Sequence, residues 1–497
     1  MSGILKDNSF QLSIILTLSF LGVGFTLLHF GFAAYGWAPF IFLPIVLGLS
    51  LRALPGSVHL TLLFLLLQCN SPAPKAGGPV DISPQTDAIP VAKGWARNSI
   101  NAVIFRRNAL VTHRDTQYIA FYDSTSHVVL AKRQLEDSTW QIRQTRYRGN
   151  TADAHNSISI MVDGKGYLHM AWDHHGDPLR YCRSVRPGAL EMSEEMSMTG
   201  IREDDVTYPE FYRFSDDDLL FVYRDGASGR GDIMMNYYNT QNQKWSSLQN
   251  GFISGERERN AYWQIALDDR DNIHLSWVWR ESGDVASNHD LAYAVSSDRG
   301  RSWRKSTGEV YELPITAATA EYAMHIPQGS ELINQTSMCT DAAGRPYIAS
   351  YWRPAGTDVP QYQLVYHDGT DWQHTQLSHR STPFSLSGGG TKRIPISRPK
   401  VLIDNRDGSK ILHLLFRDAE RGSRVSLATC TNLEKGNCTI RDLTLSSVAM
   451  WEPTYDTELW KNRKLLHIFL QKVEQGDGET QRPLAPQMVS VLEVEGF

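Results

Sequence analysis

Four histidines gather in one short stretch of the sequence. His155, His169, His174 and His175 fall within 21 residues. We interpret His169 as structural, because it opens the second strand of a repeat that is described below. His155 precedes the first strand of that repeat, and His174 and His175 follow the second. Two imidazoles brought together there could act as a base and a positioning group near neutral pH. A metal site is the competing interpretation, and the identity of any metal stays open.

A positively charged or imidazole side chain recurs at one position of the same repeat. The residues that close its second strand in successive copies are His175, Arg224, Arg280, Arg353 and Arg417. A ring of like charges facing one opening does not favour stability, because the charges repel. Guanidinium groups do suit carboxylates, which they bind through two hydrogen bonds. We therefore predict a site for a carboxylated sugar polymer that includes Arg280 and Arg353. A structural salt bridge remains the alternative for any single arginine.

Tyr208 lies in the segment Val-Thr-Tyr-Pro-Glu-Phe, sixteen residues before Arg224. This separation suits the two strands of one hairpin, which would return both side chains to the same region. A tyrosine before proline is often a packing residue. Its position beside Arg224 and the histidines favours an acid–base role.

The repeat itself predicts the fold. An apolar strand runs into Asp163, Asp268 or Asp341, and a second strand opens six residues later. The residues between them (Asp, Gly and Asn) favour tight hairpin turns. Seven such hairpins recur, at 118–132, 158–175, 208–224, 263–280, 336–353, 400–417 and 455–471. Their spacing of roughly 50–70 residues is typical of propeller blades. We therefore predict an all-β, seven-bladed β-propeller over residues 95–497.

The first part of the chain has a different character. Residues 1–69 contain three apolar runs, at 12–30, 32–51 and 59–67. The first two are long enough to span a bilayer, and the third has the length of a signal-peptide core. Lys6 and Arg52 would stay in the cytoplasm and direct the rest of the chain outward. We therefore expect two or three hydrophobic helices that serve as a membrane anchor or signal.

The end of this region resembles a bacterial lipoprotein signal, with Cys69 as the lipidated residue. A plain membrane anchor is the alternative. Residues 70–94 are rich in Pro and Gly and predict a flexible linker. The chain is thus expected to be membrane-anchored, with a monomeric domain facing the periplasm or cell surface of a bacterium. In that oxidising compartment Cys430 and Cys438 could close a loop.

Composition excludes several function classes. The net charge is −5, from 49 basic and 54 acidic residues, and no polybasic run suggests nucleic acid. The sequence contains no CxxC pair, which excludes a structural zinc ribbon. It also shows no phosphate-binding loop and no serine nucleophile elbow.

Several segments together resemble a known family. They are His155-Asn156, the hairpin 163–175, Thr207–Phe211, Tyr223–Gly226 with Ser228-Gly229, Asn288–Asp290 and the Asp-box Ser296–Trp303. Over roughly residues 100–490 the chain resembles the BNR-repeat (Asp-box) propellers that include ulvan lyases of polysaccharide lyase families 24 and 25. This resemblance implies a seven-bladed propeller that cleaves rhamnose–glucuronate polysaccharides by β-elimination.

The resemblance also implies roles for particular residues. His155 and Tyr208 would share proton abstraction and donation, and Arg224 would neutralise the uronate carboxylate. His175 and His289 would support them, although the adjacent His174 could take the place of His175. The reaction requires no cofactor, and a structural divalent cation remains open.

Two other function classes stay in view. One is a glycoside hydrolase on the same propeller, rhamnosidase-like or sialidase-like, which the segment Arg393-Ile394-Pro395 suggests. Hydrolysis requires two carboxylates astride the bond, or a tyrosine with a glutamate, and no such pair stands out. The other is a non-catalytic propeller that binds carbohydrate.

Overall fold

A computed structural model describes residues 88–497, except 106, 335–336, 407–408, 434–436 and 496–497. The predicted hydrophobic helices, Cys69 and most of the predicted linker lie outside the described residues. Within the described part of the chain, no helix combines the length and apolar character needed to cross a membrane.

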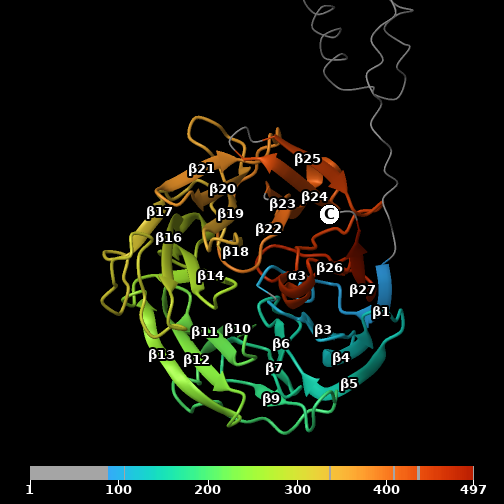
Figure 1. Cartoon of the computed structure of the whole chain (residues 1–497). Helices are drawn as coiled ribbons and strands as arrows, with labels where there is room; N and C mark the ends of the chain where they lie inside the picture. Colours follow the sequence, from blue (N-terminus) through green and yellow to red (C-terminus); the bar gives the residue numbers. More distant parts are fainter. Residues whose placement is uncertain (1–87, 106, 335–336, 407–408, 434–436, 496–497) are drawn as a thin grey trace, which may run out of the picture. The chain divides into compact units, whose positions relative to one another are not determined.

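Seven antiparallel sheets follow one another around a ring (Figure 1). We number them blades 1–7. Blade 1 is β2 (Leu110–His113), β3 (Thr116–Tyr122), β4 (His127–Gln134) and β5 (Gln141–Arg148), and blade 2 is β6 (Ile158–Val162), β7 (Leu168–Trp172) and β9 (Tyr181–Arg183). Blade 3 is β10 (Val206–Arg213), β11 (Leu219–Ala227), β12 (Arg230–Asn239) and β13 (Lys244–Ser254), to which β8 (His175–Asp177) adds an inner strand.

The remaining blades complete the ring. Blade 4 is β14 (Asn260–Leu267), β15 (Ile273–Arg280), β16 (Asn288–Ser296) and β17 (Glu321–Met324), and blade 5 is β18 (Ser337–Thr340), β19 (Pro346–Trp352), β20 (Gln361–His367) and β21 (Trp372–Gln376). Blade 6 is β22 (Lys400–Arg406), β23 (Ser409–Asp418), β24 (Arg424–Asn432) and β25 (Asn437–Asp442), and blade 7 is β26 (Leu466–Leu470), β27 (Gln487–Val494) and β1 (Ala88–Gly94). The predicted seven-bladed propeller is confirmed.

Blade 7 closes the ring by joining the two ends of the described chain. β1 pairs antiparallel with β27, so that Ala88 faces Leu492. This strand lies inside the segment that the sequence assigns to a flexible linker, so residues 88–94 belong to the propeller together with the predicted residues 95–497. The amino-acid composition of residues 70–94 is typical of a linker, and it does not show that part of this segment can pair with the free edge of β27.

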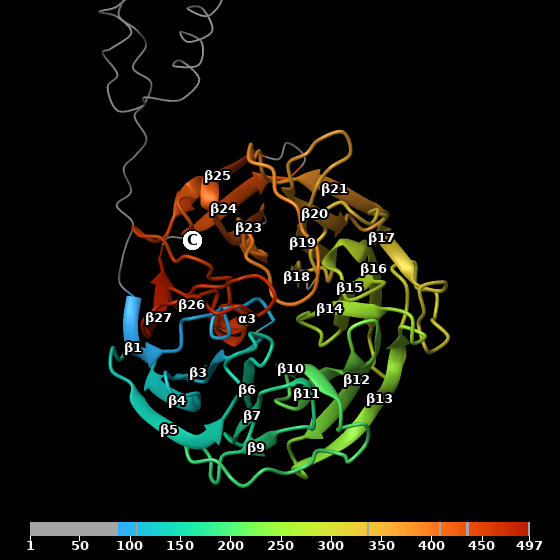
Figure 2. The same cartoon turned by 180° about the vertical axis from the view of Figure 1, so that it is seen from behind.

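Five of the seven predicted hairpins join the first two strands of a blade. Segment 118–132 instead spans β3 and β4, because β2 already supplies the first strand of blade 1. In segment 455–471 the first strand is reduced to one bridge, between Tyr455 and Ile468. The helix α3 (Thr457–Arg463) intervenes and lies on the inner side of the ring, packed against β2 and β26 (Figure 2).

The aspartate of each repeat holds its turn. Asp163 accepts hydrogen bonds from the amides of Lys165 and Tyr167 at 2.9 Å, and His169 donates to its other oxygen at 3.2 Å. His169 is fully buried, as is Trp303 of the Asp-box. These residues stabilise the blades, and neither lines the cavity that is described below.

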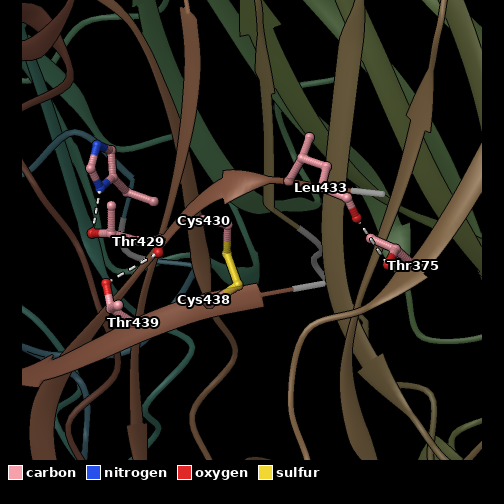
Figure 3. Close-up of a disulfide and its surroundings, with 7 residues drawn as sticks. Thr375, Thr429, Cys430, Leu433, Cys438 and Thr439 are labelled. Atoms are coloured by element: carbon pink, nitrogen blue, oxygen red, sulfur yellow. Dashed lines mark hydrogen bonds between the residues drawn. A yellow bond between two sulfur atoms is a disulfide. The ribbon is translucent and has the colours of Figure 1, made fainter. Parts of the chain in front are cut away.

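The two cysteines that sequence spacing paired do form a disulfide. Cys430 and Cys438 face each other across β24 and β25 in blade 6 (Figure 3). Cys182 and Cys339 are free thiols.

Candidate active site

A cavity of about 250 Å³ opens where the inner strands of blades 3 and 4 begin. Its lining comes from six regions of the chain that are far apart in sequence. The residues that line it are Phe105, His155, His175, Tyr208, Ser228, Tyr262, Arg280, Gly283, Val285, Ile333, Asn334, Gly389, Gly390, Thr391, Lys392, Ile394 and Arg398. Cationic and aromatic side chains predominate, and no carboxylate belongs to this set of described residues. The cavity therefore suits an anionic sugar.

His155 and His175 form a stacked pair on one wall of the cavity. Their ring centroids lie 4.0 Å apart, and Phe105 stacks on the other face of His155 at 4.9 Å. Asp153 joins the pair: its Oδ1 accepts from His155 Nδ1 and its Oδ2 accepts from His175 Nδ1, each at 2.6 Å. Because a carboxylate only accepts, both imidazoles carry a proton on Nδ1, and Nε2 is the basic nitrogen of each neutral ring.

The two histidines differ in protonation. Burial disfavours the charged form of His155, but hydrogen bonds to Asp153 and Glu479 outweigh it and raise the pKa of His155 to about 9. Burial, and then the charge of His155, lower the pKa of His175 below its usual value. At neutral pH the pair thus holds one imidazolium, His155, and one neutral base, His175.

Glu479 is a part of this site that sequence reasoning missed. Its Oε1 lies 3.1 Å from His155 Nδ1, and its Oε2 accepts from the amide of Ala154 at 2.8 Å. It comes from the loop between β26 and β27, more than 300 residues from His155. A lone glutamate in a polar loop gives no sequence signal, so only the closed ring reveals this contact.

Tyr208 lies beside the histidine pair, and its backbone conformation is strained. Its ring centroid is 5.9 Å from that of His155, and its φ of +55° is unusual for a residue before proline. The register of β10 against β11 shifts between Thr207 and Glu210, so a bulge brings Tyr208 to the cavity. Burial raises the pKa of its phenol well above 10, which keeps it a proton donor.

Two arginines without a carboxylate partner flank a second tyrosine. The guanidinium carbons of Arg224 and Arg280 lie 5.7 Å and 5.5 Å from the ring centroid of Tyr262. Arg280 lines the cavity, whereas Arg224 lies behind the rings of Tyr208 and Tyr262 and is 2% exposed. Among the described residues, no carboxylate oxygen lies within 4.0 Å of either guanidinium, so their charges are uncompensated.

Tyr262 itself was not predicted. Burial alone would raise its pKa, but Arg224 and Arg280 outweigh that effect and lower it to about 8. Its hydroxyl lies 3.0 Å from Ser228 Oγ. The repeat pattern does not single out Tyr262. This residue lies in β14, two residues after the strand begins, and aromatic residues within strands usually belong to the hydrophobic core.

Other predicted site residues lie elsewhere. His174 is fully buried, and its Nε2 accepts from the amide of Arg180 at 2.7 Å. Burial lowers the pKa of His174 to about 3, so it stays neutral and structural. Of the two neighbours, His175 lines the cavity and His174 does not.

His289 and Arg353 do not line the cavity. His289 donates to Asp290 at 3.0 Å and to Glu281 at 2.8 Å, and these bonds raise its pKa. Arg353 Nε donates to Glu331 at 2.5 Å, so its charge is neutralised. The salt bridge of Arg353 corresponds to the alternative that the sequence analysis kept for any single arginine, and His289 is hydrogen-bonded outside the cavity.

The histidine pair also bears on the metal hypothesis. Donor atoms of Asp153, His155 and His175 lie within 4.8 Å of one another. Both carboxylate oxygens already accept a short hydrogen bond, and the two rings are stacked face to face. Ligands of a shared ion would instead point their lone pairs at a common centre. The arrangement fits a hydrogen-bonded pair.

The fold defines the class of this protein, a seven-bladed β-propeller, and Arg280, Lys392 and Arg398 are the arginine and lysine residues that line the cavity beside the histidine pair. Residues 116–380, just over half of the chain, match the model of the BNR repeat-containing family. The chain belongs to that family.

Similar proteins include several ulvan lyases. A long-isoform ulvan lyase from an Alteromonas species is 28% identical over 285 residues, which cover 45% of this chain and 28% of the relative. Ulvan lyase from Nonlabens ulvanivorans is 21% identical over 343 residues, covering 59% of this chain and 69% of the relative. The chain spans a third or less of the long isoforms that it matches.

Two solved structures share the fold. The polysaccharide lyase Uly1 aligns with a TM-score of 0.58 and 15% identity, covering 82% of this chain and 92% of that one. A family 25 ulvan lyase bound to -[GlcA(1-4)Rha3S]- aligns with a TM-score of 0.53 and 16% identity, covering 72% and 96%.

Proposed function

We propose that this protein is a polysaccharide lyase that cleaves an ulvan-like, rhamnose–glucuronate polymer by β-elimination. The observation that carries the proposal is the stacked His155–His175 pair beside Tyr208, opposite two uncompensated arginines. This arrangement offers a base, an acid and a carboxylate-binding site around one cavity. The names of the similar lyases support the same substrate class.

The uronate carboxylate would bind at Tyr262, between Arg224 and Arg280. A C5 proton next to a carboxylate becomes acidic only when that charge is neutralised, and two guanidiniums supply this field. Arg280 can contact the carboxylate directly, because it lines the cavity. The sequence analysis named Arg224 as the residue that neutralises the carboxylate. In the structure it would act on the carboxylate from behind the rings of Tyr208 and Tyr262.

His175 would remove the C5 proton through Nε2, because it is the neutral member of the pair. This differs from the assignment of His155 as the base, since an imidazolium with a pKa of about 9 cannot accept a proton at neutral pH. His155 instead holds a positive charge beside the developing negative charge. Tyr208 donates its proton to the departing C4 oxygen, and C4–O cleavage leaves a C4=C5 double bond.

A hydrolase fits the cavity less well. The described lining contains no carboxylate, and Asp153 and Glu479, which contact the lining residue His155, are both engaged with it. A non-catalytic binder would not need a phenol held in a strained conformation.

Incubation with ulvan distinguishes the three possibilities. A lyase produces a conjugated, ultraviolet-absorbing unsaturated uronate in step with new reducing ends. Reducing ends without that absorbance would indicate a hydrolase, and neither signal would leave a binding protein. Loss of the absorbance in Tyr208→Phe would tie the reaction to this cavity.

We further propose that the propeller acts outside the cytoplasm, held at a membrane by residues 1–69. The Cys430–Cys438 disulfide supports an oxidising compartment. Fractionation of cells, with labelling of Cys69 by a lipid precursor, tests the location and separates a lipoprotein from a plain anchor.

A further inference from the structure

A second cavity lies along the channel, away from the residues assigned to catalysis. It has a volume of about 160 Å³, and no described residue lines both this cavity and the one beside the histidine pair. It lies between the ends of β10 and β14, the strands β18 and β22, and the helix α3, which border the channel at the centre of the ring (Figure 1). We propose that this cavity binds a free sugar acid, a single six-membered ring with hydroxyl groups and one carboxylate.

The two cavities take residues from opposite ends of the inner strands β10 and β14. Tyr208 and Tyr262 lie near the beginning of these strands and line the first cavity, whereas Arg213 and Leu267 end them and line the second. Five residues of extended chain span about 16 Å. A ligand in the second cavity therefore does not occupy the place of the bond that is cleaved, and this inference does not rest on the proposed function.

Lys400 gives the second cavity an unpaired positive charge. This residue begins β22, is only 6% exposed and lines the cavity. In the described part of the chain, no carboxylate lies within 4.0 Å of its ammonium group, and the group has no hydrogen-bond partner. Lysine is almost never buried to this extent without a paired anion. An anionic group of a ligand would supply the missing partner.

The other charged side chains of the cavity do not compensate this charge. Arg213 Nη2 donates to Glu458 at 2.7 Å, and Arg107 Nε lies 3.5 Å from Glu210, so both arginines are paired within the protein. The remaining charged residues of the described lining are one exposed aspartate and three lysines, namely Asp269, Lys400, Lys461 and Lys464. This balance favours a ligand with a negative charge.

Gln264 adds a buried acceptor that needs a donor. Its side chain is 5% exposed and lines the same cavity, and its Nε2 donates to the carbonyl of Ile265 at 3.1 Å. Its Oε1 has no hydrogen-bond partner among the described residues, which is costly for a buried oxygen. A carboxylate has no proton to donate to this oxygen, whereas a hydroxyl group does. An anion that also carries hydroxyl groups satisfies both Lys400 and Gln264.

The size of the cavity restricts the ligand to one ring. A cavity of about 150 Å³ holds a benzene ring, and the volume here is similar. Tyr455 and Trp460 contribute aromatic rings to the lining, and Ser337 and Thr340 add hydroxyl groups that can bond to a sugar. A benzoate-like ring would leave Gln264 without a donor. A hexuronate monomer meets all of these conditions.

The test is calorimetry with glucuronate as the probe, in the full chain. The starting variant is Arg280→Met, which removes the proposed carboxylate partner from the catalytic cavity, so that binding there does not obscure the second site. Adding Lys400→Met should weaken the binding of glucuronate at least tenfold. Adding Lys410→Met is the matched control, because that lysine of the same blade pairs with Asp341 at 2.9 Å and does not line the cavity. Equal affinities in all three variants would overturn the proposal.

Other ligands test the chemistry of the site. Glucose lacks the carboxylate and benzoate lacks the hydroxyl groups, so each should bind at least tenfold more weakly than glucuronate. Glucose 6-phosphate that binds more tightly than glucuronate would contradict the assignment to a sugar acid. Gln264→Leu should weaken the binding of glucuronate about tenfold and leave that of benzoate unchanged. This variant keeps the proposal testable if Lys400→Met does not fold, and an unchanged affinity for glucuronate would contradict the role of Gln264.

Alkylation of Cys339 shows where the ligand lies. This free thiol lines the second cavity, whereas Cys182, the other free thiol of the described residues, is fully buried in blade 2. In the Arg280→Met variant, saturating glucuronate should slow the reaction of Cys339 with iodoacetamide at least tenfold, as measured by mass spectrometry of the peptide that contains it. Binding of glucuronate without this protection would place the ligand elsewhere and overturn the assignment.

Discussion

Arg224 and Arg417 occupy equivalent positions, near the ends of the second strands of blades 3 and 6, and both are almost fully buried at 2% and 1% exposure. Their surroundings differ. Arg417 donates to the carbonyls of Trp451, Pro395 and Ile394 at 2.9–3.0 Å. Arg224 donates to the carbonyl of Gly226 and interacts with the hydroxyl of Tyr262, and its Nη1 has no hydrogen-bond partner among the described residues. One arginine stabilises the fold, whereas the other keeps an unused charge beside the cavity.

Arg280 and Arg353, two other members of the ring, differ in the same way. Arg280 lines the cavity without a described carboxylate partner, while Arg353 is paired with Glu331. A repeat therefore specifies where a side chain stands in a blade but not what surrounds it. The two arginines without a carboxylate partner, Arg224 and Arg280, both lie in blades 3 and 4 beside the cavity.

Arg224→Met should have the largest effect on catalysis. Removing one preorganised charge from a buried site typically lowers kcat by about 10²–10³-fold. Because the charge is unpaired, the melting temperature should stay the same or rise. Kinetics on ulvan and a thermal melt measure both quantities. If Arg224→Met lowers the melting temperature together with kcat, Arg224 has a structural role instead.

Tyr208→Phe and His175→Gln should each lower kcat by about 10²-fold or more, as loss of a general acid or base does. His174→Gln is the matched control for the histidine, since His174 is buried and away from the cavity. Single-turnover assays on folded variants provide the measurement. Full activity in His175→Gln would return the role of base to His155.

Arg417→Met should show the opposite pattern to Arg224→Met. Three buried carbonyls would lose their donor, which costs about 3 kcal/mol of folding stability. The activity that remains at a temperature where the protein is folded should be close to that of the wild type. Denaturant unfolding tests this expectation, and an unchanged midpoint would remove the contrast between the two arginines.

The pH profile of kcat/KM should have two limbs. His175 must be neutral to act as a base, so activity falls as pH drops through its lowered pKa, below 6.5. His155, with a pKa of about 9, and Tyr262, with a pKa of about 8, lose their protons on the alkaline side. Glu479→Gln removes an anion that raises the pKa of His155 and should move the alkaline limb to lower pH. An alkaline limb that stays in place would show that Glu479 does not act through His155.

Arg353→Met should change activity less than about twofold, because Glu331 already neutralises this arginine at the surface. The same polymer and assay as for Arg224→Met allow direct comparison. A tenfold loss would place Arg353 in the substrate path and restore the full ring that the repeat suggested.

Much of the architecture follows from local sequence. Asp163 and its equivalents close hairpins by bonding to amides two and four residues away, and such contacts are visible in a single segment. The same holds for His155, Tyr208 and Arg224, each in a distinctive motif. Tyr262, Glu479 and Lys392 could not be found in this way. Tyr262 comes from blade 4, Glu479 from blade 7 and Lys392 from the connection between blades 5 and 6, and no short motif shows that these segments meet at one site.

The binding of carboxylate by uncompensated arginines can be tested directly with two polymers. Ulvan and its carboxyl-reduced derivative, in which each glucuronate is converted to glucose, would be titrated into Tyr208→Phe and into Tyr208→Phe with Arg280→Met. We expect the first variant to prefer intact ulvan at least tenfold, and the double variant to lose most of that preference. Equal affinity of the first variant for both polymers would contradict the account, because the two free guanidiniums would then have no anion to bind.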